Sequence, residues 1–191
     1  PDYIHTVLEA LKLAFSDRHA YYGDPEFVDV PMAGLLSKEY AAARRQAIDP
    51  AAACPGMPDP GDPRGRRMFL ENVVRKELAA AGDGGDSDTS YTCVVDRWGN
   101  AFSATPSDSM LGGPVVPGLG IVLSPRGKQS WLDPDHPSSL QPWKRPRLTP
   151  NPAIAFKDGK LFMPFGTPGG DSQCTAMVQM FLKLSSFKNV Q

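Results

Sequence analysis

The chain has 191 residues, with 20 lysines and arginines against 21 aspartates and glutamates, and a formal net charge of −1. Apolar residues make up 41% and charged residues 21%, so the chain can build a hydrophobic core and is not compositionally disordered. The length suits one domain or slightly more. The near-neutral charge disfavours a generally basic nucleic-acid binder. No stretch approaches the roughly 18 apolar residues of a membrane helix.

The three cysteines, at positions 54, 93 and 174, are too few and too scattered for a disulfide framework or a zinc site. They fit reduced, buried thiols. The three histidines are isolated from one another, so no metal site is expected. Pro1 stands where an initiating methionine would, and no signal peptide follows it, so we expect a fragment of a longer protein. Its compartment, cytoplasmic or periplasmic, is unknown from this sequence.

The first part of the chain is predicted to be helical. Apolar residues spaced three or four apart indicate an amphipathic helix over 3–22, which the Gly-Asp-Pro sequence at 23–25 would end. Ser37 is placed to cap a second helix that runs to about Ile48. A third, short helix is expected over 69–78.

The pattern changes after a polar, Gly-rich segment at 81–88, which is typical of an exposed, flexible tether. A short apolar run follows at 121–123, and a helix is predicted over about 171–184. Asp158-Gly159, which lies between this apolar run and this helix, is typical of a type I′ hairpin turn. The strands predicted from β-rich composition are 90–96, 101–105, 153–157 and 160–165, and the turn at 97–100 is predicted to join the first two as a hairpin. Helices, then strands, then a helix indicate an α+β layered fold rather than alternating βαβ units.

The junction Asp88-Thr89 is the first candidate for chemistry, because a flexible tether there runs directly into a strand that begins with threonine. If the chain were cut there, Thr89 would carry both a hydroxyl and a free α-amine. That pairing forms an activated nucleophile in which the amine is the general base. The alternative is the ordinary preference of threonine for strands.

The sequence Gly166-Thr167-Pro168-Gly169-Gly170 is the second candidate, because it joins a predicted strand to a predicted helix. Successive glycines before a helix allow backbone N–H groups to converge on an anion or an oxyanion. The alternative is a tight structural turn. The segment is not a P-loop, since no Gly-Lys-Ser/Thr follows.

A basic cluster is the third candidate, since its side chains could hold a substrate carboxylate. The alternatives are a solvated loop or pairing with the acidic tether. The cluster comprises Arg126, Lys128, Lys144, Arg145 and Arg147.

Taken together and in order, these features resemble the γ-glutamyltranspeptidase family over nearly the whole chain. The matching segments are Tyr3-Ile4-His5, 9–18, Tyr22-Gly23-Asp24-Pro25, 35–40, 89–96, Gly99-Asn100, Lys144-Arg145-Pro146 and 165–170. The resemblance implies an N-terminal-nucleophile (Ntn) hydrolase with a four-layer αββα sandwich, of which this chain would be part. It implies a precursor that cuts itself into a large and a small subunit, with residues 1–88 ending the large subunit and 89–191 beginning the small one. No cofactor is expected.

Carried over by position, the resemblance makes Thr89 the catalytic residue and places Ser107 as a second hydroxyl beside it. Gly169 and Gly170 would supply the oxyanion hole. Leu148 and Thr149 fall where the family usually has a serine pair that touches the substrate carboxylate. Self-cleavage would separate Asp88 from Thr89.

The chain departs from the family where acidic residues often hold the substrate's α-amine. Arg126 stands there, and an arginine would repel an ammonium and favour an anionic or acyl group. The expected activity is therefore transfer or hydrolysis of a γ-glutamyl or related acyl group, for example from glutathione-type amides, by a divergent, acylase-like member. The alternatives are a glutaryl or cephalosporin-type acylase, and a homologue that no longer processes itself and only binds ligand. The expected partners are a small-molecule acyl amide and the paired subunits.

Overall fold

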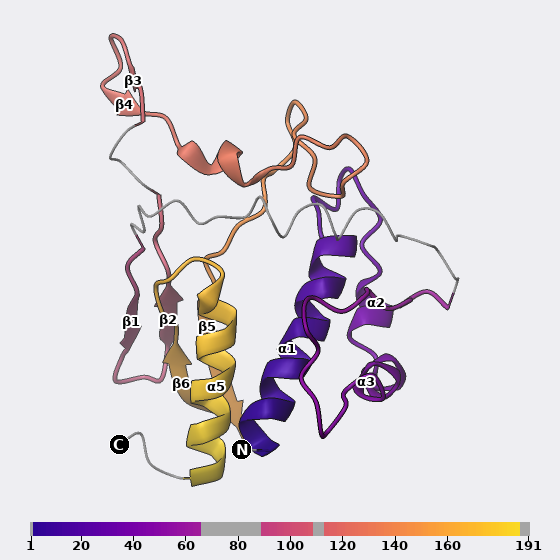
Figure 1. Ribbon diagram of the computed structural model, residues 1–191. Coiled ribbons are helices and arrows are strands. Elements are labelled where there is room, and N and C mark those ends of the chain that lie inside the picture. Colours follow the sequence, from indigo (N-terminus) through magenta and orange to yellow (C-terminus); the bar gives the residue numbers. More distant parts are fainter. Residues whose placement is uncertain (1, 66–88, 109–112, 188–191) are drawn as a thin grey trace. The chain divides into compact units, whose positions relative to one another are not determined.

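The computed structural model describes residues 2–65, 89–108 and 113–187, which form two compact units (Figure 1). The first unit contains residues 2–65 and 129–147. The second contains 89–108, 113–128 and 148–187. The predicted helix over 69–78 and the predicted tether, including Asp88, lie outside the described residues. The two units are groups of residues that contact one another. The boundary expected at Thr89 is instead a cut in the backbone, so it stays a prediction.

Three helices begin the first unit: α1 (Asp2–Tyr21), α2 (Met32–Leu35) and α3 (Lys38–Arg45). The predicted first helix is confirmed, and so is the cap of α3, because the Ser37 hydroxyl accepts a hydrogen bond from the backbone N–H of Tyr40 at 3.0 Å. Helix α3 ends three residues earlier than expected. The next N–H groups, at 46–48, bond three residues back, which tightens the chain ahead of Asp49-Pro50.

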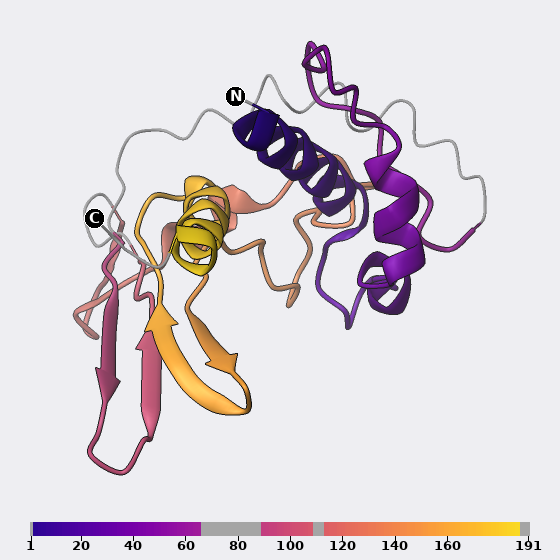
Figure 2. The ribbon, with the colours of Figure 1, turned by 90° about the horizontal axis from the view of Figure 1, so that it is seen from below.

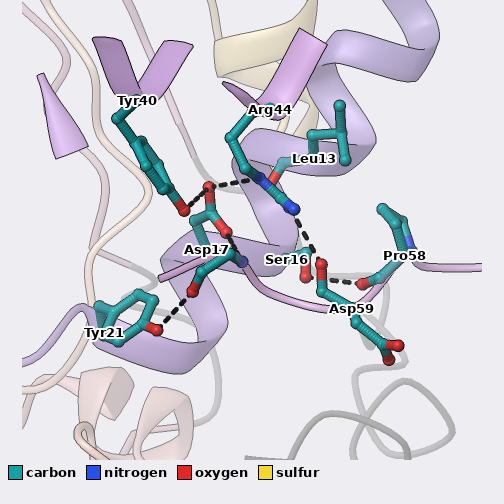
Figure 3. A network of polar contacts seen from close by, with 9 residues as sticks. Leu13, Ser16, Asp17, Tyr21, Tyr40, Arg44, Pro58 and Asp59 are labelled. Atoms are coloured by element: carbon teal, nitrogen blue, oxygen red, sulfur yellow. Dashed lines mark hydrogen bonds and ion pairs between the residues drawn. The ribbon is translucent and has the colours of Figure 1, made fainter. Parts of the chain in front are cut away.

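A buried carboxylate joins α1 to α3 and to the loop that follows (Figure 3). One oxygen of Asp17 accepts from the Tyr40 hydroxyl at 2.9 Å and from Arg44 Nε at 3.2 Å. The other accepts from the backbone N–H of Gly61 at 2.8 Å. Burial, and then the hydrogen bond to Asp17, raise the pKa of Tyr40, so its hydroxyl stays a donor at neutral pH.

We expect Asp17→Ala to destabilise this unit strongly. The substitution leaves the partly buried Arg44 guanidinium without its carboxylate, and breaking a largely buried pair in this way costs on the order of 3 kcal/mol. Asp29→Ala is the matched control, because the Asp29 carboxylate that pairs with Arg64 is 87% exposed. Urea unfolding measures both variants, and an Asp17 variant no less stable than the Asp29 variant would contradict the assigned role of the network.

Residues 129–147 fold back onto the end of α1. The Ser138 hydroxyl donates to the backbone carbonyl of Tyr22 at 2.8 Å, although 116 positions separate the two residues. Gly23 lies so close to Pro137 that a Cβ at this position would overlap the Pro137 carbonyl. His136 stacks on Trp131 at a ring separation of 4.2 Å. Residues 129–147 are therefore part of the first unit, with the helices α1 to α3.

The second unit contains three antiparallel strand pairs and a helix (Figures 1 and 2). Strands β1, β2, β6 and β5 lie side by side, with α5 along one face. Phe165 of β6 stacks on Phe181 of α5 at 5.5 Å between ring centres. The elements are β1 (Thr92–Val95), β2 (Ala101–Ala104), β3 (Val115–Val116), β4 (Ile121–Val122), a 3₁₀ turn (Pro125–Gln129), β5 (Ala153–Lys157), β6 (Lys160–Phe165) and α5 (Ser172–Phe187).

The predicted hairpins are confirmed. Strands β1 and β2 pair from Thr92 opposite Ala104 to Val95 opposite Ala101. Between β5 and β6, Asp158 and Gly159 have φ of 52° and 73°, as a type I′ turn requires. The pair β3–β4 is an addition to the elements predicted from sequence, since only 121–123 was expected to be a short apolar run.

Much apolar surface stays uncovered in the described chain. Val94, Val95 and Phe102 on β1 and β2 are all about half exposed or more. Cys93 is exposed and the other two cysteines are partly exposed, so the expectation of buried thiols is wrong, although all three are free. Within the described residues no helix combines the length and apolarity needed to cross a membrane.

Candidate active site

Two hydroxyls meet where the chain enters β1. Thr89 and Ser107 face each other in an isolated antiparallel bridge, and the N–H of Ser90 donates to the carbonyl of Pro106 at 2.9 Å. The bridge brings Thr89 Oγ1 within 2.6 Å of Ser107 Oγ. Both residues are partly exposed. The structure therefore places the two hydroxyls as the sequence expectation requires, while their catalytic role stays a prediction.

Arg126 reaches the same pair from the 3₁₀ turn. Its guanidinium hydrogen-bonds both the hydroxyl and the backbone carbonyl of Ser107. The backbone N–H of Arg126 donates to Ser124 Oγ at 3.3 Å, and that hydroxyl donates to Asp108 at 2.8 Å. These contacts hold the turn against the segment that carries Ser107. A positive charge consequently lies one hydroxyl away from Thr89.

The glycine turn follows β6. Gly169 has φ of 125° and Gly170 has φ of 54°, both in the region that favours glycine. The carbonyls of Gly169 and Gly170 accept from the N–H groups of Ser172 and Gln173 at 3.0 and 3.2 Å. Their own N–H groups donate no backbone hydrogen bond within the described residues. The expected oxyanion-hole role of these two N–H groups stays a prediction.

The Thr89–Ser107 hydroxyl pair and the glycine turn after β6 lie at the same end of the strands. A Cβ at Gly166 would overlap the ring of Tyr91 and would lie 3.3 Å from Thr105 Oγ1. Thr105 is two positions before Ser107, and Gly166 is three positions before Gly169. The residues expected to be the nucleophile and the oxyanion hole therefore lie near the same end of the strands, while their roles in acyl transfer stay predictions.

The remaining predicted substrate residues are divided between the units. Leu148 is exposed and Thr149 is buried, and both belong to the second unit. Lys144 and Arg145 belong to the first.

Arg145 pairs with Asp24 at 2.6 Å and with Glu26 at 2.9 Å. The hydrogen bond from Arg145 holds the pKa of Asp24 well below its ordinary value. Lys144 donates to Ser139 at 3.0 Å. Both cations thus have partners within the first unit, and their role in substrate binding stays a prediction.

Two supporting residues were missed from the sequence. The Tyr91 hydroxyl lies 3.0 Å from Ser103 Oγ, and that hydroxyl contacts the carbonyl of Phe165 at 3.4 Å. Tyr91 thereby ties the strand after Thr89 to the strand before the glycine turn. The signal was the glycine at 166, whose missing side chain makes room for the Tyr91 ring. Within the described ranges no three His, Cys, Asp or Glu side chains gather as metal ligands.

The chain is similar to known proteins both in sequence and in structure. The glutathione hydrolase proenzyme of Bacillus subtilis strain 168 is 34% identical over 176 residues, which is 91% of this chain and 30% of that protein. The solved structure of LmbA2991HD has a TM-score of 0.83 and 43% identity, over 97% of this chain and 32% of the other. Cephalosporin acylase from Bacillus halodurans has a TM-score of 0.72 and 31% identity, over 97% and 30%.

The chain spans about a third of the length of these relatives. The family model described as gamma-glutamyltranspeptidase matches residues 1–190. The motifs that suggested this resemblance lie within the matched region, on both sides of Thr89. The chain therefore belongs to the gamma-glutamyltranspeptidase family.

Proposed function

We propose that the complete protein carrying this chain is an N-terminal-nucleophile enzyme that cuts itself before Thr89. The mature enzyme transfers or hydrolyses a γ-glutamyl or related acyl group through an ester on Thr89. The observation that carries this proposal is the pair of Thr89 and Ser107 hydroxyls, 2.6 Å apart at the start of β1. The relative from Bacillus subtilis is named a proenzyme, which supports processing.

Self-cleavage needs no group beyond the chain and water. Thr89 Oγ1 attacks the carbonyl carbon of Asp88 and forms a C–O bond. The C–N bond of the Asp88-Thr89 peptide breaks, and the nitrogen takes the hydroxyl proton to become an amine. Water then hydrolyses the ester, which restores the Thr89 hydroxyl and leaves a carboxylate on Asp88.

The new α-amine equips Thr89 for turnover. Its reference pKa is about 7.7–8.0, so about a tenth to a sixth of it is neutral at pH 7 and can accept the hydroxyl proton. The Thr89 oxygen attacks the acyl carbon of the amide, and negative charge on the acyl oxygen meets the N–H groups of Gly169 and Gly170. The amine leaves with the proton. Water or an acceptor amine then takes the acyl group from Thr89.

Residues 1–88 and 89–191 are proposed as the end of the large subunit and the start of the small one. Together with the rest of both subunits they would form a four-layer αββα sandwich. The exposed apolar faces of β1 and β2 support this, because the remaining layers would cover them. This chain by itself would then be inactive.

An acylase acting on an anionic acyl group is the second candidate function. The positive charge of Arg126 beside Ser107 favours it, because an ammonium on the acyl group would be repelled there. Similarity to the cephalosporin acylase also favours it. Leu148 and Thr149 are proposed to complete the acyl subsite in the second unit, and Lys144 and Arg145 are proposed as separate contacts to the substrate. The third alternative, a homologue that binds ligand without processing, predicts one uncut chain.

Mass spectrometry and a donor comparison test the proposal. The complete protein should yield a subunit whose first residue is Thr89. Glutaryl anilide should be hydrolysed with kcat/KM about tenfold or more above γ-glutamyl anilide, which corresponds to about 1.4 kcal/mol of repulsion. A preference for the γ-glutamyl donor would remove the acylase candidate. An uncut chain that turns over neither donor would remove both enzymatic functions.

A further inference from the structure

Three side chains form a continuous chain of hydrogen bonds that ends at the proposed nucleophile. The Arg126 guanidinium contacts Ser107 Oγ, and Ser107 Oγ lies 2.6 Å from Thr89 Oγ1. The guanidinium also contacts the backbone carbonyl of the same serine. Arg126 is thus attached to both the side chain and the backbone of Ser107, which is a specific arrangement rather than a single surface contact.

The chemistry of arginine fixes the direction of the first hydrogen bond in this chain, from Arg126 to Ser107. A guanidinium has five N–H donors and no acceptor, so Ser107 Oγ must accept from Arg126. The one hydrogen of the Ser107 hydroxyl is not used by Arg126, so Ser107 can donate it to Thr89 Oγ1. In that arrangement the hydrogen of Thr89 is free to pass to the base during attack.

The positive charge of Arg126 also favours loss of the hydroxyl proton from Thr89. A serine hydroxyl that accepts from a cation becomes a stronger donor, since hydrogen bonds in a chain polarise one another. That donor stabilises the negative charge that grows on Thr89 Oγ1 as its proton leaves. The same cation disfavours protonation of the Thr89 α-amine after cleavage, which keeps the base neutral at lower pH.

We propose that Arg126 is a positioning residue that acts on Thr89 through the Ser107 hydroxyl, in self-cleavage and in turnover alike. This inference rests on the proposed function. It differs from a role in substrate binding in one respect that can be measured. Self-cleavage uses the Thr89 hydroxyl but involves no substrate, so a group that only binds substrate cannot affect its rate.

The experiment follows precursor cleavage and turnover in the complete protein. Arg126→Met should slow both by about tenfold to hundredfold, as loss of a group that orients a reacting residue does elsewhere. Arg126→Lys should recover part of both rates, because its ammonium can still donate to Ser107. Arg97→Met is the matched control, since the Arg97 side chain lies on the exposed hairpin turn over Trp98, and both rates should be unchanged.

A double-mutant cycle shows whether Arg126 acts through Ser107. In the background of Ser107→Ala, adding Arg126→Met should slow self-cleavage by less than about twofold, because the connecting hydroxyl is already absent. The acidic limb of the kcat/KM profile should move to higher pH in Arg126→Met but not in Arg97→Met. Normal self-cleavage in Arg126→Met, with only a raised KM for glutaryl donors, would overturn the inference and make Arg126 a substrate contact. The proposed function fails separately, if Thr89→Ala is still cut.

Discussion

Replacing Thr89 by alanine is expected to leave the precursor as one uncut chain and to lower kcat by at least about 10⁴-fold. The substitution removes the oxygen that attacks in both reactions. The partner hydroxyl of Ser107 remains, but it lies 18 positions further along the chain and has no peptide bond of residue 88 attached to its own nitrogen. It therefore cannot substitute for Thr89 in an N-to-O acyl shift.

Two further variants test whether the effect comes from the Thr89 hydroxyl itself. Thr89→Ser keeps the oxygen and should still be cut, at a reduced rate. Thr92→Ala removes a threonine from the exposed first position of β1 and should behave as the parent. Intact-mass measurement after expression separates one chain from two, and anilide hydrolysis reports kcat. Cleavage before residue 89 in Thr89→Ala would disprove the proposed processing.

Local features of the fold could be predicted from the sequence, because neighbouring residues determine them. The turn at Asp158-Gly159 defines the β5–β6 hairpin, since both positions need positive φ and both residues tolerate it. Ser37 marks the start of α3 because its hydroxyl can accept from a backbone N–H three residues along. Elements without a periodic pattern were missed. Helix α2 has four residues and strand β3 has two, too few to show a spacing.

Residues of the site could be predicted from the sequence only where the signal lies within one short segment. Thr89 at a strand start and the glycines at 169 and 170 are local signals. The contact of Arg126 with Ser107 joins residues 19 positions apart, and the contact of Arg145 with Asp24 joins residues 121 positions apart. A sequence shows the charge of each arginine but not the partner that the fold brings to it. Arg126 was consequently assigned to substrate from its charge and its position relative to the family pattern, and Arg145 from its charge.

Gly170→Ala is expected to fold and to lose most of its kcat, by about 10²-fold, with a smaller change in KM. Gly170 has φ of 54°, within the small left-handed region that alanine can enter at a cost of about 1 kcal/mol. The variant can therefore keep the turn. Its methyl group and the small backbone adjustment that it causes would move the N–H away from the position where the oxyanion forms.

Gly169 would be a poorer test of the same idea. Its φ of 125° lies outside the left-handed region open to alanine, and a Cβ there would stand 2.6 Å from Ser172 Oγ. Replacing it would disturb the start of α5 and confound folding with catalysis. The milder strain at Gly170 keeps the two effects separable.

Gly159→Ala provides the matched control. Gly159 also has positive φ, 73°, and a Cβ added to it meets no atom within 4 Å. It carries a similar backbone cost in the β5–β6 turn and has no part in the proposed site. Thermal melts should show comparable losses of stability for the two alanine variants, while only Gly170→Ala loses kcat. Equal kcat in both would show that the turn is structural and would remove the oxyanion-hole assignment.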